Sequence, residues 1–209
     1  MTNEPLDGEF EELLKRATAL RGHLCLGLPL GIKMSRKGLR LMGMVDPKER
    51  DGLVVFVENN RCAVDAVQVT TGCSMGSRRL KVFEYGKSAA TFRDRESERA
   101  IRVFARPELN SEAVRLAVAE GVISGDDRPE PTSQAGRRAL MNAFMKMGED
   151  QIFDSRSVRI RDVAKYARGT AVPRANCFKC GEEIIDGRGI LRAGRTLCVA
   201  CDGSAYYIE

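Results

Sequence analysis

Two Cys-x-x-Cys motifs near the C-terminal end limit the fold of this chain more strongly than any other part of its sequence. Cys177 and Cys180 form the first motif, Cys198 and Cys201 form the second, and seventeen residues separate them. Each motif predicts a tight turn that directs two sulfur atoms at one ion, and the intervening glycines let the two turns meet. We therefore expect a four-cysteine zinc site whose binding energy replaces the hydrophobic core that so short a segment cannot build.

The same cysteine pattern leaves two other interpretations open. A single iron ion prefers the same four thiolates, because ligand softness alone does not separate iron from zinc. Paired cysteines also serve as redox dithiols, although four of them in paired turns are usually structural ligands. Phe178, Tyr206 and Tyr207 lie among basic residues, where they can stack on nucleic-acid bases, form the small core of the segment or make a docking face.

Length and composition predict a folded protein with one full domain and a small appendage. The chain has 209 residues, of which 43% are hydrophobic and 30% are charged, as in ordinary globular proteins. No apolar run approaches the roughly 20 residues needed to cross a bilayer, so we expect no membrane association. The acidic first twelve residues lack the pattern of a secretory signal, which predicts the cytoplasm.

Hydrophobic periodicity predicts an α+β N-terminal domain, with an antiparallel sheet and flanking helices. Helices are expected at 10–20, 24–41 and 62–71, and the second tolerates Pro29 only in its first turn. Strands are expected at 53–58, 80–85, 89–94 and 100–106, the last three as an antiparallel meander, and helices at 111–121 and 132–148. A short strand at 157–163 and a linker at 169–176 follow. The predicted domains are therefore residues 1–170 and a zinc ribbon at 171–209.

The basic residues gather in the C-terminal part of the chain. The net charge is +5 over the whole chain, and residues 156–201 alone hold ten Lys and Arg against four Asp and Glu. A basic segment favours an anionic partner such as nucleic acid. Four thiolates around one Zn²⁺ would reduce the net charge of this segment by two, which weakens that argument.

A second group of potential ligands lies among the first 73 residues. The single histidine, His23, stands two residues before Cys25 at an expected helix N-terminus, where the helix dipole favours a thiolate. Cys62 and Asp65 share one face of the next expected helix, with Gln68 beside them, and Cys73 follows its C-terminal glycine. Three thiols, one imidazole and one carboxylate can therefore meet, although isolated buried cysteines more often serve only as small apolar residues.

Two stretches give the chain a family resemblance. The segment Gly22-His23-Leu24-Cys25-Leu26-Gly27, followed by Cys-x-x-Asp-Ala-x-Gln-x-x-Thr-Gly-Cys from Cys62 to Cys73 and a four-cysteine ribbon, resembles the FmdE family, which takes its name from formylmethanofuran dehydrogenase. The resemblance implies an α+β domain with a Cys/His cleft that holds a metal, usually zinc, a zinc ribbon, and a homodimer. It also implies partner subunits in a molybdenum or tungsten oxidoreductase, whose redox centres lie in those other subunits, so catalysis by this chain stays open.

Carried over residue by residue, the resemblance makes four residues candidate metal ligands and catalytic groups: His23, Cys25, Cys62 and Cys73. Asp65 is a further candidate catalytic group, and Gln68 and Thr71 are candidate cofactor contacts. Two positions depart from the usual family pattern His-Gly-His-x-Cys-Pro-Gly, because Arg21 stands at the first histidine and Leu26 at the proline. Position 21 therefore supplies no ligand.

Three functions remain in competition at this point. The first is a zinc-binding protein with an accessory or undefined catalytic role in one-carbon or molybdenum and tungsten enzyme metabolism, with a second zinc in its N-terminal domain. The second is a regulator that binds nucleic acid or protein through the basic ribbon and senses a ligand through the N-terminal domain. The third is a thiol-rich scaffold without a metal in the cleft.

Overall fold

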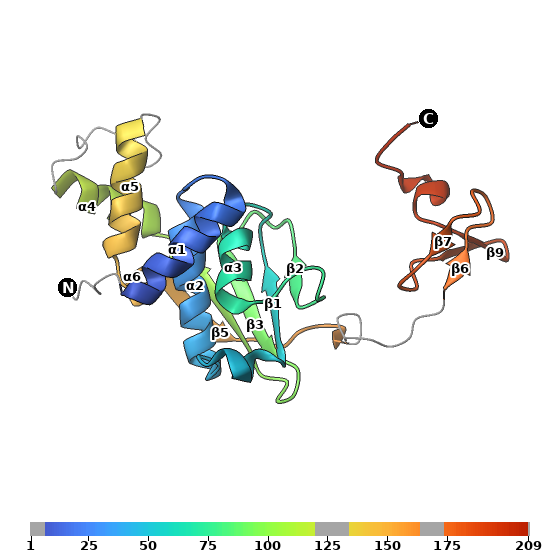
Figure 1. Ribbon diagram of the computed structural model, residues 1–209, viewed down its shortest axis with the longest axis horizontal. Coiled ribbons are helices and arrows are strands. Elements are labelled where there is room, and N and C mark those ends of the chain that lie inside the picture. Colours follow the sequence, from blue (N-terminus) through green and yellow to red (C-terminus); the bar gives the residue numbers. More distant parts are fainter. Residues whose placement is uncertain (1–6, 120–133, 164–173, 209) are drawn as a thin grey trace. The chain divides into compact units, whose positions relative to one another are not determined.

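The computed structural model describes residues 7–119, 134–163 and 174–208. The chain divides into two compact units, Met1–Arg161 and Asp162–Glu209 (Figure 1). Within the described residues, no helix is long and apolar enough to cross a membrane.

The first unit is an α+β domain built on a mixed five-stranded sheet, which confirms the predicted fold class. The strand order is β2-β1-β3-β4-β5. The strands are β1 Leu53–Val57, β2 Leu80–Val82, β3 Ala89–Asp94, β4 Ala100–Ala105 and β5 Phe153–Ser157. The helices are α1 Gly8–Arg21, α2 Gly27–Met42, α3 Ala63–Thr71, α4 Leu109–Ala119, α5 Gln134–Lys146 and α6 Glu149–Ile152, with a 3-10 turn at Pro47–Arg50.

The predicted meander is wrong for its first strand, β2. β2 pairs parallel with β1, with Val55 opposite Leu80, whereas β3 pairs antiparallel with the other side of β1. Helix α3 connects β1 to β2, and such a crossover connection places two strands parallel in one sheet. The short linear spacing between β2 and β3 therefore does not reflect a hairpin.

Several element boundaries also differ from the prediction. The strand expected at 157–163 is instead β5, which ends at Ser157 and pairs with β4. The helices expected at 111–121 and 132–148 correspond to α4 and α5, and residues 120–133 of those predictions lie outside the described residues. The same holds for residues 169–173 of the expected linker.

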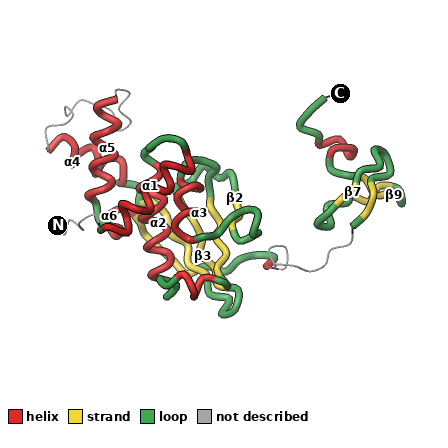
Figure 2. Tube along the Cα trace, in the orientation of Figure 1, coloured by secondary structure: helices red, strands yellow, loops and turns green. Residues whose placement is uncertain are grey.

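Helix α2 forms the centre of the first unit, between the sheet and α3. Figures 1 and 2 show α1, α2 and α3 side by side against the strands, and α2 contacts α1, α3, β3 and β4. Its Pro29 lies in the first turn, as predicted, where the missing N–H costs no helical hydrogen bond. Leu28, Ile32 and Leu39 are all at most 3% exposed, so the apolar positions of this helix are buried on several sides.

Glycines permit the close approach of α2 to its neighbours. A Cβ atom at Gly31 would lie 2.7 Å from Cβ of Ala66 and 2.9 Å from the carbonyl oxygen of Ala63 in α3. A Cβ atom at Gly38 would lie 2.3 Å from the Phe92 ring on β3. Because real Cβ atoms do not approach other atoms this closely, only glycine fits these two positions without a shift of the helix.

Two buried lysines attach α2 to the segment that leads into β5. Lys37 Nζ donates to Asp150 Oδ1 at 2.7 Å and to the carbonyl of Phe153 at 2.5 Å, and Lys33 Nζ donates to the carbonyl of Met147 at 2.6 Å. These contacts compensate for the desolvation of the ammonium groups. Hydrogen bonds to specific carbonyls thus set the position of α2 on the sheet.

The Gly31→Ala variant tests the contact between α2 and α3. Alanine improves intrinsic helix propensity by roughly 1 kcal/mol, but the clash with the backbone of Ala63 forces the helices apart. We expect net destabilisation of about 1–3 kcal/mol, measured by urea unfolding. The matched control is Gly8→Ala in α1, where a Cβ atom meets nothing within 4 Å and stability should not fall. Equal stability of both variants would contradict the close contact.

Candidate functional site

The four C-terminal cysteines come together in the second unit, from two separate turns. Cys177 follows strand β6 (Ala175–Asn176), which pairs with β7 (Glu183–Ile184), and Cys180 lies in the turn between them. Cys198 follows strand β9 (Arg195–Leu197), and Cys201 lies in the helical turn Ala200–Ser204. Strand β8 (Ile190–Arg192) pairs with β9, and Ala193 and Gly194, both at positive φ, close this hairpin as a type I′ turn.

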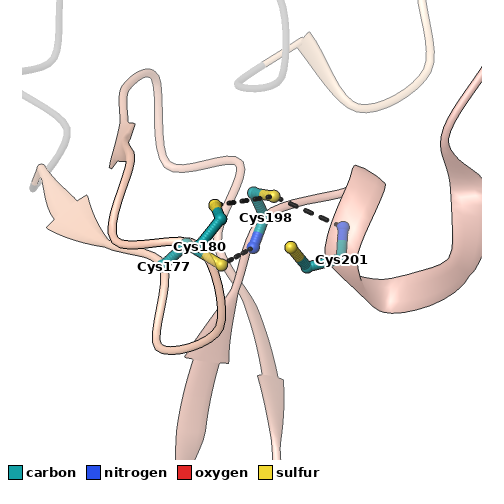
Figure 3. A group of neighbouring side chains, drawn as sticks. All are labelled: Cys177, Cys180, Cys198 and Cys201. Carbon is teal, nitrogen blue, oxygen red and sulfur yellow. Dashed lines mark hydrogen bonds between the residues drawn. The ribbon is translucent and has the colours of Figure 1, made fainter. Parts of the chain in front are cut away.

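The geometry of the four sulfur atoms fits a tetrahedral metal site. All four lie within 4.8 Å of one another, and Cys180 Sγ is 4.0 Å from Cys198 Sγ (Figure 3). A tetrahedron with Zn–S bonds of about 2.3 Å has sulfur–sulfur edges of roughly 3.8 Å. The cluster can therefore bind a metal ion such as zinc, and the ribbon predicted for this segment is confirmed as a fold.

Backbone N–H groups prepare one of these thiols for metal binding. The Cys198 N–H donates to Cys177 Sγ at 3.3 Å, and the N–H groups of Cys180 and Cys198 lower the pKa of the Cys177 thiol to about 6. Desolvation and the neighbouring thiols raise the pKa of Cys201 to about 12. Four crowded sulfurs thus resist a common negative charge, and a divalent cation removes that conflict.

The N-terminal candidates divide into two locations instead of one. Cys62 precedes the first residue of α3, and Cys73 follows the C-terminal cap of the same helix, Gly72. A helix of this length separates its ends by roughly 15 Å. Cys73 is 0% exposed within the sheet-side core, and its Sγ lies 3.6 Å from the carbonyl oxygen of Leu53. The structure therefore does not place Cys73 with Cys62.

Cys25 and Cys62 do come together. Their side chains share a hydrogen bond, and both are partly exposed and pack against the cluster of α1, α2 and α3 side chains. The position that a Gly27 Cβ would occupy is 3.1 Å from Cys62 Sγ, so the missing side chain at Gly27 leaves room for this thiol. Gly27 precedes Gly31 by four residues, a spacing that could have indicated the close helix pair but did not enter the prediction.

The two thiols lie at the N-terminal ends of two helices that run in the same direction. Gly27 lies next to Cys62 and Ala63, and Gly31 one turn later lies next to Ala63 and Ala66, so α2 and α3 are parallel. Both helix dipoles therefore favour negative charge at the cysteine pair. Backbone N–H groups of Gly27 and Leu28 act on Cys25 in the same sense.

Burial opposes these helix dipoles at Cys25. Desolvation, followed by the contact with Cys62, raises the pKa of the Cys25 thiol to about 11. The protonated thiol therefore predominates at neutral pH, and its thiolate is a minor species. Burial likewise raises the pKa of Cys73.

The other predicted site residues have mixed surroundings. His23 is exposed in the loop between α1 and α2. Asp65 Oδ2 lies 3.8 Å from Nε of Arg21, so its charged partner is the residue that replaces the usual family histidine. Thr71 donates to the carbonyl of Val67 at 2.7 Å and accepts the Cys73 N–H at 3.1 Å, and the Gln68 carbonyl accepts the Gly72 N–H. These last contacts terminate α3.

Among the described residues, the four ribbon cysteines are the one group of three or more ligands close enough to hold a metal ion. Metal binding by His23, Cys25, Cys62 and Cys73, their catalytic roles, and cofactor contacts of Gln68 and Thr71 stay predictions.

Comparison with known proteins settles the family. A family model described as "FmdE, Molybdenum formylmethanofuran dehydrogenase operon" matches residues 20–154, which is more than half of the chain. This chain belongs to the FmdE family. The matched segment contains His23, Cys25, Cys62 and Cys73 and ends before the ribbon, so the family assignment rests on the N-terminal domain.

Two individual proteins are similar along nearly the whole chain. A probable S-adenosyl-L-methionine-binding protein of Archaeoglobus fulgidus is 28% identical over 96% of this chain, which spans only 55% of that relative. The crystal structure of an FmdE-like protein of tungsten formylmethanofuran dehydrogenase from Syntrophus aciditrophicus matches with a TM-score of 0.68 at 21% identity, and the match covers 100% of both chains. The latter likeness shows a shared fold, ribbon included.

The raised pKa of Cys25 predicts how its reactivity changes with pH. Because only the thiolate attacks iodoacetamide, the alkylation rate of Cys25 in the folded chain should rise about tenfold per pH unit between roughly pH 7 and 10. Peptide mass spectrometry after timed labelling measures this rate. Cys25 in the urea-unfolded chain is the control, and its rate should level off near pH 8.5. Levelling in the folded chain below pH 9 would contradict the role of burial.

Proposed function

We propose that this FmdE family protein binds one structural zinc ion in its ribbon and presents a dithiol site, Cys25 with Cys62, in its N-terminal domain. The proposed role is accessory, in one-carbon or molybdenum and tungsten enzyme metabolism, as the family suggests. The observation that carries the site is the contact between the two thiols at the N-terminal ends of α2 and α3. The cytoplasm is the proposed location.

Zinc in the ribbon would replace a core that the second unit lacks. Phe178, Leu191 and Tyr206 are 61%, 70% and 99% exposed, so large apolar side chains of this unit are not gathered inside it. Cys177 is 2% exposed and Ile184 is 6% exposed, which leaves very little buried apolar surface. A closed tetrathiolate site supplies the missing folding energy.

A second zinc in the N-terminal domain is the rival proposal for the cleft. Cys25 and Cys62 would supply two sulfurs, and exposed His23 lies in the same loop as Cys25. Zinc with an open position polarises a carbonyl or activates water. The ion pair between Arg21 and Asp65 would hold the nearest carboxylate beside that site, and Cys73 would remain in the core.

The exposed apolar residues of the ribbon suggest a protein partner. Leu191 and Tyr206 lie on the surface together with Val199, Tyr207 and Ile208. Exposed patches of this kind often mark protein interaction sites. We propose other subunits of a molybdenum or tungsten oxidoreductase, or a second copy of this chain, as the partners.

Nucleic-acid binding by the ribbon is a further candidate, supported by exposed Tyr206 and basic Arg188. Two other arginines are already engaged. Arg192 forms a two-point ion pair with Asp202, at 2.7 and 3.0 Å, and the Arg195 guanidinium lies 4.1 Å from the centre of the Phe178 ring. These contacts reduce the charge and the aromatic surface available to a nucleic acid.

Retention on single-stranded DNA separates a nucleic-acid partner from a protein partner. The leading proposal expects the full chain and its Arg188→Gln, Arg192→Gln, Arg195→Gln triple variant to elute alike at low salt. Salt-dependent retention of the wild type, lost in the triple variant, would instead establish a phosphate-binding ribbon.

The description of the archaeal relative supplies one more ligand to test. Its similarity extends over 96% of this chain, so S-adenosyl-L-methionine is a separate proposal for the N-terminal domain. Titration calorimetry with the full chain tests it directly, and S-adenosylhomocysteine provides a matched comparison without the sulfonium charge.

Zinc content decides between the dithiol site and the second zinc. We expect about one zinc per untagged chain, retained in Cys62→Ser and lost in Cys180→Ser, because only the ribbon gathers four thiols. Elemental analysis measures the content and also identifies iron. About two zinc ions in the wild type and one in Cys62→Ser would replace the dithiol site by a second metal site. Retention of zinc by Cys180→Ser would contradict the ribbon assignment.

A further inference from the structure

The cysteine pair of the N-terminal domain has a geometry suited to covalent linkage. Cys25 and Cys62 share a side-chain hydrogen bond, so their sulfur atoms already face each other. A disulfide needs sulfurs about 2.05 Å apart and Cα atoms usually 4.4–6.8 Å apart. Rotation of two partly exposed side chains is a smaller change than any movement of the packed helices.

The elements that carry the two thiols are held firmly. Cys25 belongs to a short loop that begins at Gly22, the left-handed C-cap of α1, and its carbonyl accepts the Leu28 N–H at 3.1 Å. Cys62 directly precedes α3, which packs on α2 at Gly31 without space for a methyl group. Rigid placement of both reactants favours an intramolecular reaction over two separate ones.

The remaining cysteines do not compete for either thiol. Cys73 is fully buried at the far end of α3. The four ribbon cysteines belong to the other unit and face one another, and a bound metal would protect them from reaction. The pair is therefore selected by the fold from seven cysteines.

We propose that Cys25 and Cys62 form a reversible intramolecular disulfide by exchange with low-molecular-weight disulfides. This inference rests on the proposed dithiol site, and it adds the class of co-reactant and the product.

The chemistry consists of two exchange steps. One cysteine thiolate attacks a sulfur of the disulfide RSSR, the S–S bond breaks, and RS⁻ leaves and takes up a proton, which produces a mixed disulfide. The second cysteine thiolate then attacks the protein sulfur of this mixed disulfide and releases a second RSH. Two protein thiols are oxidised, RSSR is reduced to two RSH, and the two thiol protons end on those products. A dithiol reductant reverses both steps.

The two helix N-termini favour this exchange. Each step requires a thiolate at the pair, and the dipoles of α2 and α3 both stabilise negative charge there. Access is also sufficient, since neither side chain is fully buried.

The test uses zinc-loaded full-length chain incubated with oxidised glutathione, followed by denaturation with a chelator and alkylation at once. Intact mass spectrometry should show five alkylated cysteines where the untreated chain shows seven. Peptide mapping should identify a single link between the peptides of Cys25 and Cys62, and dithiothreitol should restore seven.

Single variants separate the proposed pair from general thiol oxidation. Cys73→Ser, the matched control, should still lose two thiols to the same link. Cys25→Ser and Cys62→Ser should each stop at a glutathione adduct on the remaining partner. Gly27→Ala keeps every thiol but places a methyl group near Cys62 Sγ, so it should slow the link several-fold. Melting curves verify that each variant is folded.

Other outcomes would overturn the inference. A link that contains Cys73, two separate glutathione adducts in the wild type, or an unchanged two-thiol loss in Cys25→Ser would each exclude the pair. Zinc content in the same samples keeps the two proposals apart. One zinc per chain without a link would remove the disulfide and leave the thiol site, whereas a second zinc lost in Cys62→Ser would remove the dithiol site itself.

Discussion

The close contact between α2 and α3 is the constraint on which the N-terminal domain depends. Gly31 lies against the backbone of Ala63 and against Ala66, and Gly27 lies against Cys62. Two parallel helices this close bring their N-terminal ends to one place, and with them Cys25 and Cys62. A larger residue at either glycine would separate the helices and the thiols together, so the packing and the chemistry of this region share one cause.

The position of α2 on the sheet is fixed by contacts on its other sides. Gly38 admits the Phe92 ring from β3, and the buried ammonium groups of Lys33 and Lys37 bind carbonyl oxygens of the segment between α5 and β5. A buried ammonium without partners is costly, so these lysines tolerate few other placements of the helix. The sheet, α2 and α3 therefore form one packed stack that determines where the thiols lie.

Local patterns predicted what local physics determines and missed what long-range packing determines. The spacing of the four ribbon cysteines sufficed for the ribbon, because a few residues set each turn, and Pro29 marked the first turn of α2, since proline lacks the N–H that later turns require. The strand at Leu80 could pair with either neighbour on periodicity alone, and only the crossover through α3 places it parallel to β1. The shared Cys62–Cys73 motif suggested a single site, but nine helical residues carry the second cysteine into the core.

The replacement of the usual family histidine by Arg21 changes what the cleft can do. A guanidinium stays protonated and offers no lone pair to a metal, and here it also lies 3.8 Å from the Asp65 carboxylate. Two groups that could have joined a first coordination sphere are thus directed to each other. With Cys73 in the core, the ligands left at the cleft are two sulfurs and exposed His23, a set that is poor for a closed metal site and sufficient for thiol chemistry. The fold and this one substitution together shift the balance of the site toward the cysteine pair.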